Sequence, residues 1–319
     1  MCETLGFGSS AIDTLLSSVI DYAGTFPPAS LELRLATAGY AGAFASDAAW
    51  LLGRFVLAAG SLDRFEPPAF EPAAAADRPA ELTPTPWPIS VVVSPAPSTP
   101  ETALPAHADL ASRIAAFNDR WQGRAQIVAV EYPAVNDVAL DRLADAYDHT
   151  LEIFIEVPYG PDCRRRIDAI GARGLFLKLR AGGVARTAFP SVDELTDALC
   201  ACADAGVTLK ATAGLHHALR GSYPVTAEPL ADTATMHGFL NVLVAAALAY
   251  RGASRSTIAS TLAETDWNAF SFTLDQVAWR GHPVDRDELA RFRRRFFRAF
   301  GSCSFDDPVR ELRTAGLLA

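Results

Sequence analysis

The chain alternates short hydrophobic, β-branched runs with helical patterns along most of its length, and this alternation restricts its fold strongly. Continuous hydrophobic runs are typical of strands buried on both faces, as in parallel sheets covered by helices. Eight such runs in about 300 residues predict an α/β fold, a (β/α)8 barrel of the TIM type. The expected strands are 18–24, 51–58, 89–94, 126–132, 151–157, 174–180, 207–212 and 268–274, and the expected helices are 29–45, 107–120, 136–148, 162–171, 191–204, 233–250, 254–264 and 285–300.

An open doubly wound sheet is the alternative fold, but no Gly-x-Gly-x-x-Gly follows an early strand. We therefore expect a barrel, and we expect no cofactor. Eleven of the 21 prolines lie between Phe65 and His107, a density that excludes central strand and any helix beyond its first turn. Residues 64–87 and 95–106 are therefore expected to be Pro-rich surface loops around the third strand, within a single domain of residues 1–319.

Composition and charge exclude several classes of partner. The net charge of -9, with no compensating basic stripe, argues against nucleic acid. The longest apolar stretch, 238–250, is shorter than the roughly 20 residues of a membrane span. Because this helix is apolar nearly all round, it predicts a subunit interface and hence a homo-oligomer. The five cysteines at irregular spacing, and a start without a basic segment before an apolar run, predict a cytoplasmic protein.

Three consecutive expected strands, 151–157, 174–180 and 207–212, have one aliphatic face and one face that carries polar residues. Side chains alternate along a strand, so the polar face points into the barrel. The C-terminal ends of barrel strands form the active site. The polar residues expected there are Glu156, Lys178, Arg180, Lys210 and Thr212.

Lys178 and Lys210 are the only lysines among 28 basic residues, and both fall on this face. Arginine cannot act as a nucleophile, whereas a buried lysine can lose its proton. Two adjacent ammonium groups disfavour each other's charge, which leaves one as a neutral amine that attacks a carbonyl. Glu156 could then move protons around the imine. The alternatives are that both lysines bind a phosphate or carboxylate, or that they have a structural role.

The segments Glu-Ile-Phe-Ile-Glu, Leu-Phe-Leu-Lys-Leu-Arg-Ala-Gly-Gly and Leu-Lys-Ala-Thr-Ala-Gly-Leu-His-His resemble strands five to seven of deoxyribose-phosphate-aldolase-type class I aldolases. The resemblance covers about 60 residues, and Ile20-Asp21 also resembles that family's first strand. The resemblance to these aldolases implies that Lys178 forms a Schiff base and that Lys210 lowers the pKa of Lys178. Arg180 and His216-His217 replace small residues of that family, and no Gly/Ser-rich phosphate loop follows the expected eighth strand.

A second resemblance spans most of the chain. The segments Asp21-Tyr-Ala-Gly-Thr-Phe-Pro-Pro28 and Lys210-Ala-Thr-Ala-Gly-Leu-His-His217 are similar to motifs of a bacterial protein family of uncharacterised activity. This resemblance implies no reaction.

Other polar residues suggest further roles. Glu131 ends the fourth strand and is a candidate acid or base, while Arg54, in an apolar run, must pair with a buried carboxylate or bind an anionic substrate. A metal site is the alternative for the acidic and histidine residues, although adjacent histidines rarely bind the same ion. The candidate metal ligands are Glu131, Glu156, His216, His217 and His237.

Together these residues predict a barrel enzyme of the lyase or class I aldolase kind, acting on a small carbonyl compound. Lys178 would be the nucleophile, Lys210 its charged neighbour and Glu156 the proton shuttle. The alternatives are a metal-dependent lyase or hydrolase, and a non-catalytic barrel that binds a small molecule. The expected substrate-binding residues, for an anionic substrate, are Asp21, Arg54, Glu131, Arg180, Thr212, His216 and His217.

Overall fold

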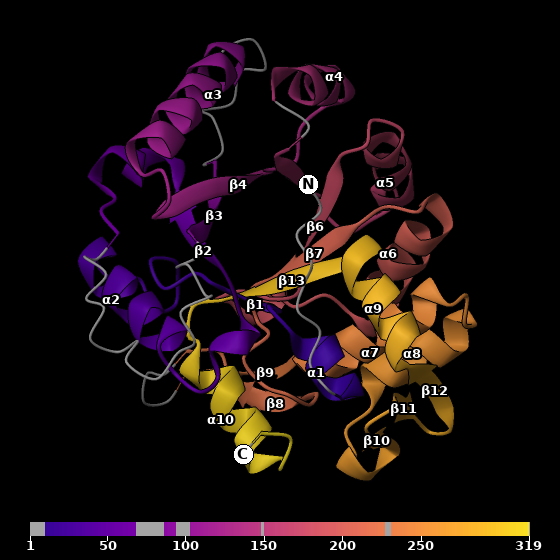
Figure 1. Ribbon diagram of the computed structural model, residues 1–319. Coiled ribbons are helices and arrows are strands. Elements are labelled where there is room, and N and C mark those ends of the chain that lie inside the picture. The colour runs from indigo at the N-terminus through magenta and orange to yellow at the C-terminus, as the bar shows by residue number, and fades with distance from the viewer. Residues whose placement is uncertain (1–9, 68–85, 94–102, 148–149, 227–230, 319) are drawn as a thin grey trace.

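The computed structural model describes residues 10–67, 86–93, 103–147, 150–226 and 231–318. Eight parallel strands close into a barrel in the order β1-β13-β7-β6-β5-β4-β3-β2, which confirms the predicted TIM-type fold (Figure 1). The strands are β1 (Ile20–Tyr22), β2 (Leu52–Ala58), β3 (Trp87–Val92), β4 (Ala125–Tyr132), β5 (Glu152–Glu156), β6 (Phe176–Arg180), β7 (Leu209–Thr212) and β13 (Phe297–Ser302).

Helices cover the outside of the barrel, as Figure 1 shows for α2 to α6. Several begin at side-chain caps that the sequence encodes; at α6, Ser191 and Glu194 form a reciprocal capping box. None of the described helices is long and apolar enough to cross a bilayer. The helices are α1 (Ala11–Leu16), α2 (Leu33–Phe44), α3 (Ala103–Arg120), α4 (Asp137–Ala146), α5 (Cys163–Gly171), α6 (Val192–Ala205), α7 (Phe239–Tyr250), α8 (Arg255–Ala263), α9 (Arg286–Arg295) and α10 (Asp306–Thr314).

The eighth barrel strand is β13, so the assignment of the predicted strand 268–274 to the barrel was wrong, and the predicted helix 285–300 extended too far at its end. Residues 270–272 instead form β10 of a small antiparallel sheet with β11 (Gln276–Trp279) and β12 (His282–Asp285). The helix α9 ends at Arg295, and the chain enters the barrel at Phe297. The eighth strand therefore does end in a Gly/Ser-rich segment, Gly301-Ser302-Cys303-Ser304.

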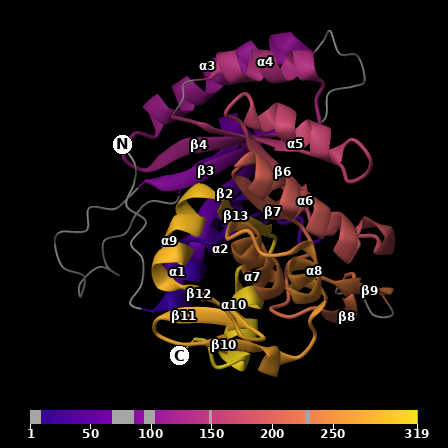
Figure 2. The same cartoon turned by 90° about the vertical axis from the view of Figure 1, so that its right-hand side faces the viewer.

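A second insertion, the hairpin of β8 (Gly221–Pro224) and β9 (Thr233–Met236), follows β7 (Figure 2). The predicted helix 233–250 therefore begins only at Phe239. The expected loop 64–87 lies largely outside the described residues; of 95–106, residues 95–102 lie outside them and α3 begins at Ala103.

The apolar helix α7 is buried within the chain itself, so its assignment to a subunit interface was wrong. It packs against α6 and α8 on one side and against β11, β12 and α9 on the other. Eleven of its 12 residues are buried. Figure 2 shows the small sheet close to α1 and α7, at the bottom of the view.

Candidate functional site

The two lysines lie side by side at the same level of the barrel. In the parallel register, Glu156 of β5 is opposite Lys178 of β6, which is opposite Lys210 of β7. Because each residue is at the same alternation phase of its strand, all three side chains point toward the barrel interior. Charge therefore gathers where β5, β6 and β7 approach the barrel mouth.

Lys210 is a buried cation with two carboxylate partners. Its Nζ lies 2.5 Å from Asp21 Oδ2 and 2.6 Å from Glu131 Oε1, and its side chain is 1% exposed. Burial disfavours the charged amine, but the two carboxylates outweigh this effect and raise the pKa of Lys210. Lys210 is therefore held as an ammonium ion.

Glu131 of β4 connects the two lysines. Its Oε2 lies 3.0 Å from Lys178 Nζ, while Oε1 also accepts a hydrogen bond of 2.7 Å from Ser90 Oγ on β3. Although burial opposes ionisation, Lys210 and Lys178 lower the pKa of Glu131. Ser90 was not predicted from the sequence. It could have been noticed as the one polar residue in the run Ile-Ser-Val-Val-Val.

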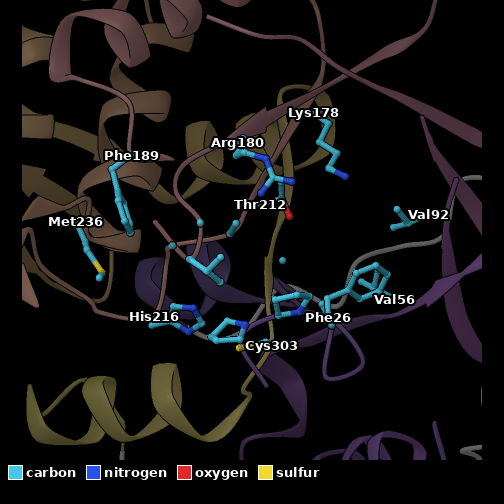
Figure 3. A pocket seen from close by; sticks show the side chains of 18 of the residues that line it. Phe26, Val56, Val92, Lys178, Arg180, Phe189, Thr212, His216, Met236 and Cys303 are labelled. Atoms are coloured by element: carbon cyan, nitrogen blue, oxygen red, sulfur yellow. The ribbon is translucent and has the colours of Figure 1, made fainter. Parts of the chain in front are cut away.

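Although both lysines line the cavity that opens at the barrel mouth, Lys178 is the more exposed of the two (Figure 3). Its Nζ lies 3.3 Å from Glu156 Oε2, and its side chain is 8% exposed. Glu156 in turn lies 3.4 Å from Arg180 Nε. Asp21, Glu131 and Glu156 thus face Lys178, Lys210 and Arg180 in a connected cluster of three carboxylates and three cations.

The cavity has a volume of about 690 Å³, enough for a small-molecule substrate. Of the predicted substrate-binding residues, Glu131, Arg180, Thr212, His216 and His217 line it. Asp21 does not: it is 1% exposed and, besides its ion pair with Lys210, accepts a 2.8 Å hydrogen bond from the Arg54 backbone N–H. Asp21 therefore positions Lys210 from below the cavity.

Arg54 also lies outside the cavity lining, deeper in the barrel. It forms an ion pair with Glu152 of β5, whose other oxygen lies 2.6 Å from Arg298 Nε. Burial by itself would lower the pKa of Arg54, but the neighbouring carboxylates outweigh this effect and raise the pKa. Of the two predicted roles for Arg54, the structure shows pairing with a buried carboxylate.

Replacing Arg54 by leucine is expected to lower the free energy of unfolding by about 3 kcal/mol, because Glu152 loses one of its two partners in a largely buried setting. Urea unfolding at neutral pH measures this loss. The control is Arg255→Leu, which removes an exposed arginine paired with Asp193 and Asp197 and should cost much less, because exposed ion pairs contribute little. Equal losses in the two variants would contradict a structural role for the Arg54 ion pair.

The histidines occupy three different environments. His216 is partly buried beside the cavity, and burial lowers its pKa. His217 stacks on Tyr223, with ring centroids 3.5 Å apart, and its Nδ1 lies 3.1 Å from Glu311 Oε1.

His237 is buried away from the cavity, where Nε2–H donates to the Pro190 carbonyl at 2.9 Å and Nδ1 accepts from Arg220. Burial lowers the pKa of His237 to about 4. Among the described residues, no group of three or more His, Cys, Asp or Glu is arranged to hold a metal ion.

Fold and cluster together define this chain as a (β/α)8-barrel protein with a lysine–carboxylate cluster at the barrel mouth. No protein-family model matches the chain, and a search of curated proteins finds no match. Among solved structures, a nitroalkane oxidase from Streptomyces ansochromogenes is similar at 17% sequence identity and a TM-score of 0.30. The similarity covers 66% of this chain and 62% of that chain, so less than two thirds of the oxidase is spanned. A likeness at this level carries no argument about activity.

Proposed function

We propose that the protein is an enzyme that forms an imine between Lys178 and a small carbonyl substrate, and that it makes or breaks a carbon–carbon bond through this imine. One observation carries the proposal: of the two lysines that line the cavity, Lys178 is the more exposed, at 8%, while Lys210 is 1% exposed and is held as a cation between two carboxylates. This arrangement separates a nucleophile that substrate can reach from a charge that stays in place.

The charge balance of the cluster favours a positive group at the position of Lys178 Nζ. Three carboxylates balance Lys210, Arg180 and one further positive charge. A protonated imine carries the same charge as the ammonium ion that it replaces. Glu131 and Glu156 therefore stabilise the covalent intermediate without rearrangement of the site.

The chemical step begins when Lys178 loses one proton to Glu156, the more exposed of its two carboxylate partners. The neutral amine adds to the carbonyl carbon, forming a carbon–nitrogen bond, and the carbonyl oxygen takes up a proton. A second proton, delivered by Glu156, lets this hydroxyl leave as water and gives the iminium ion. The iminium then accepts the electron pair of the carbon–carbon bond broken at the neighbouring carbon, while the departing carbon becomes a carbonyl as its hydroxyl gives up a proton. The enamine that remains takes up a proton at carbon, and water hydrolyses the resulting imine to release the second product and the free lysine.

Glu156 suits the proton-transfer role better than Glu131. Glu131 is 2% exposed and has Lys178, Lys210 and Ser90 as partners, and its lowered pKa keeps it ionised. Glu156 is 27% exposed and lines the cavity beside Lys178. It can therefore exchange protons with solvent and with a bound substrate.

Borohydride trapping tests the proposal. The folded protein is incubated with propanal and sodium borohydride, which reduces an imine to a stable secondary amine, and mass spectrometry locates the propyl group. We expect the label at Lys178 in preference to Lys210 and the α-amine. The control is the same reaction in about 8 M urea, which unfolds most small proteins and in which the two lysines should react alike. Equal labelling of the folded protein, or labelling at Lys210, would contradict the proposal.

A further inference from the structure

We propose that the cavity selects a carbonyl compound with an uncharged, apolar substituent over a phosphorylated one. This inference rests on the proposed imine function and names its substrate class. It departs from the sequence-based expectation of an anionic substrate.

An apolar wall faces the lysines across the barrel. In the closed strand order, β2 and β3 lie diametrically opposite β6 and β7. Arg54 and Ser90 point inward, since they contact Glu152 and Glu131, so by strand alternation Val56 and Val92 also point inward. Both valines line the cavity. A substituent on a carbonyl group held at Lys178 would therefore extend toward these side chains.

The mouth is apolar at both ends in Figure 3. Phe26, which follows β1, lies with Val56 and Val92 at one end. Phe189, from the β6–α6 loop, and Met236, from β9, lie at the other end, with Arg180 and Thr212 between the two groups. Apolar surface of this kind favours a hydrocarbon chain or ring, because its burial removes it from water.

The glycines after β6 and β7 are explained by packing. A Cβ placed on Gly182 would lie 2.5 Å from the Phe189 ring and 2.8 Å from the Cα of Gly214. Gly214 has a φ of +72° and makes the reciprocal close approach. These loops therefore need glycine so that they can pass each other beneath Phe189, and the aromatic ring covers their backbone.

The Gly/Ser-rich segment after β13 uses its polar groups internally. Ser302 Oγ donates to the Ser304 carbonyl at 2.6 Å, and Ser304 Oγ accepts from the Asp307 N–H at 3.1 Å. The first turn of α10 carries Asp306 and Asp307. Two carboxylates at a helix N-terminus occupy the position where a phosphate would otherwise be favoured, and they would repel it.

The cations near the mouth already have anionic partners. Arg180 Nε lies 3.4 Å from Glu156, and Arg310 forms an ion pair with Asp307. Glu311, which pairs with His217, adds a further carboxylate to the cavity wall. A dianionic phosphate would compete with these carboxylates for the same guanidinium groups, whereas an uncharged substituent would not.

A matched pair of aldehydes tests this selectivity. Imine formation is followed by borohydride trapping at Lys178 over a range of concentrations of hexanal and of glyceraldehyde 3-phosphate. We expect half-maximal labelling by hexanal at a concentration at least about tenfold lower than by glyceraldehyde 3-phosphate. This ratio corresponds to a difference in binding free energy of about 1.4 kcal/mol. Val92→Thr keeps the side-chain volume but adds a hydroxyl group. It should raise the hexanal concentration for half-maximal labelling about fivefold and leave that of glyceraldehyde 3-phosphate unchanged. The control Val138→Thr, at an exposed position of α4, should change neither.

Binding of unreactive analogues separates this inference from the imine proposal. Saturation-transfer NMR compares 1-hexanol with glycerol 3-phosphate, neither of which can form an imine. Preferential binding of 1-hexanol that weakens in Val92→Thr supports the inference even if no aldehyde labels Lys178, a result that would remove only the imine. Tighter binding or more efficient trapping of the phosphorylated compound overturns the inference even if Lys178 is labelled. Absence of binding by either analogue, together with equal trapping of the aldehydes, also overturns it.

Discussion

Methionine in place of Lys178 is expected to abolish imine trapping and to lower turnover of a carbonyl substrate by about 10⁴-fold or more, because the covalent step loses its nucleophile. The fold should tolerate this change. Glu131 keeps Lys210 as a partner and Glu156 keeps Arg180. Two measurements on the same preparation check these losses: the turnover of an aldehyde that forms the imine with the wild type, and borohydride labelling with that aldehyde.

Lys178→Arg is the matched control for charge. Arginine retains the positive charge opposite Glu131 and Glu156 but cannot form an imine. An anion-binding role for Lys178 predicts that this variant keeps much of the activity, whereas the imine mechanism predicts a loss similar to that of Lys178→Met. Substantial activity in the arginine variant would therefore contradict covalent catalysis at this residue.

Removing Lys210 is expected to have the largest effect on stability. Asp21 and Glu131 share this ammonium group, and both carboxylates are buried. Lys210→Met leaves Asp21 without its buried cationic partner, and we expect the free energy of unfolding at pH 7 to fall by about 4 kcal/mol. Lys178→Met removes a lysine from the same cluster but leaves each carboxylate a cation, so it should cost much less. Similar losses in urea unfolding of the two variants would contradict this account.

The stability difference between wild type and Lys210→Met should depend on pH in a defined direction. The pKa of Glu131 is lowered in the folded wild type, so its contribution is present above the ordinary value of about 4.5 and is lost as the pH falls through the folded pKa. Without Lys210, burial favours protonated carboxyl groups, which lessens the penalty in the variant at low pH. The difference should therefore be largest near pH 7 and shrink progressively as the pH falls below about 4.5 toward the folded pKa of Glu131.

At alkaline pH, the direction in which stability changes follows from Lys210 itself. Its pKa is raised above 10.5, so its contribution is complete below that value and is lost as the pH rises through the folded pKa.

The barrel fold, and the position of the two lysines on adjacent strands at the same height in the barrel, could be predicted from the sequence because both depend on local patterns. Strands five to seven alternate strictly, so the phases of Lys178 and Lys210 follow from the period of two. Their parallel register then places the lysines on adjacent strands. Apolar continuity of the other runs indicated the parallel sheet.

The eighth strand could not be predicted in the same way. The segment 297–302 contains Arg298 and Gly301 and directly follows an arginine-rich helix, so no hydrophobic run marks it. Its register against β7 also shifts between Phe297 and Phe300, which breaks the alternation. The Phe-Ser-Phe pattern at 270–272 gave a clearer strand signal, but it forms the small antiparallel sheet.

The partners of the lysines were harder to infer than the lysines. Asp21 and Lys210 are 189 residues apart in sequence, and no local pattern indicates which residues so far apart will form an ion pair. Asp21 and Glu131 were predicted as substrate-binding groups, and their direct contacts with the lysines were not predicted. The apolar wall of Val56 and Val92 was missed because valines within a strand look like ordinary core residues.

The pairing of β1 with β13, Ile20 opposite Phe300, means that the barrel closes only when the two ends of the chain meet. Contacts between residues so distant in sequence form slowly, because loop closure must precede the interactions that stabilise them. During synthesis, Asp21 leaves the ribosome long before the segment that closes the barrel around it. The ion pair between Asp21 and Lys210 would thus be enclosed only at the end of folding, so that an incomplete chain would not carry the assembled cluster.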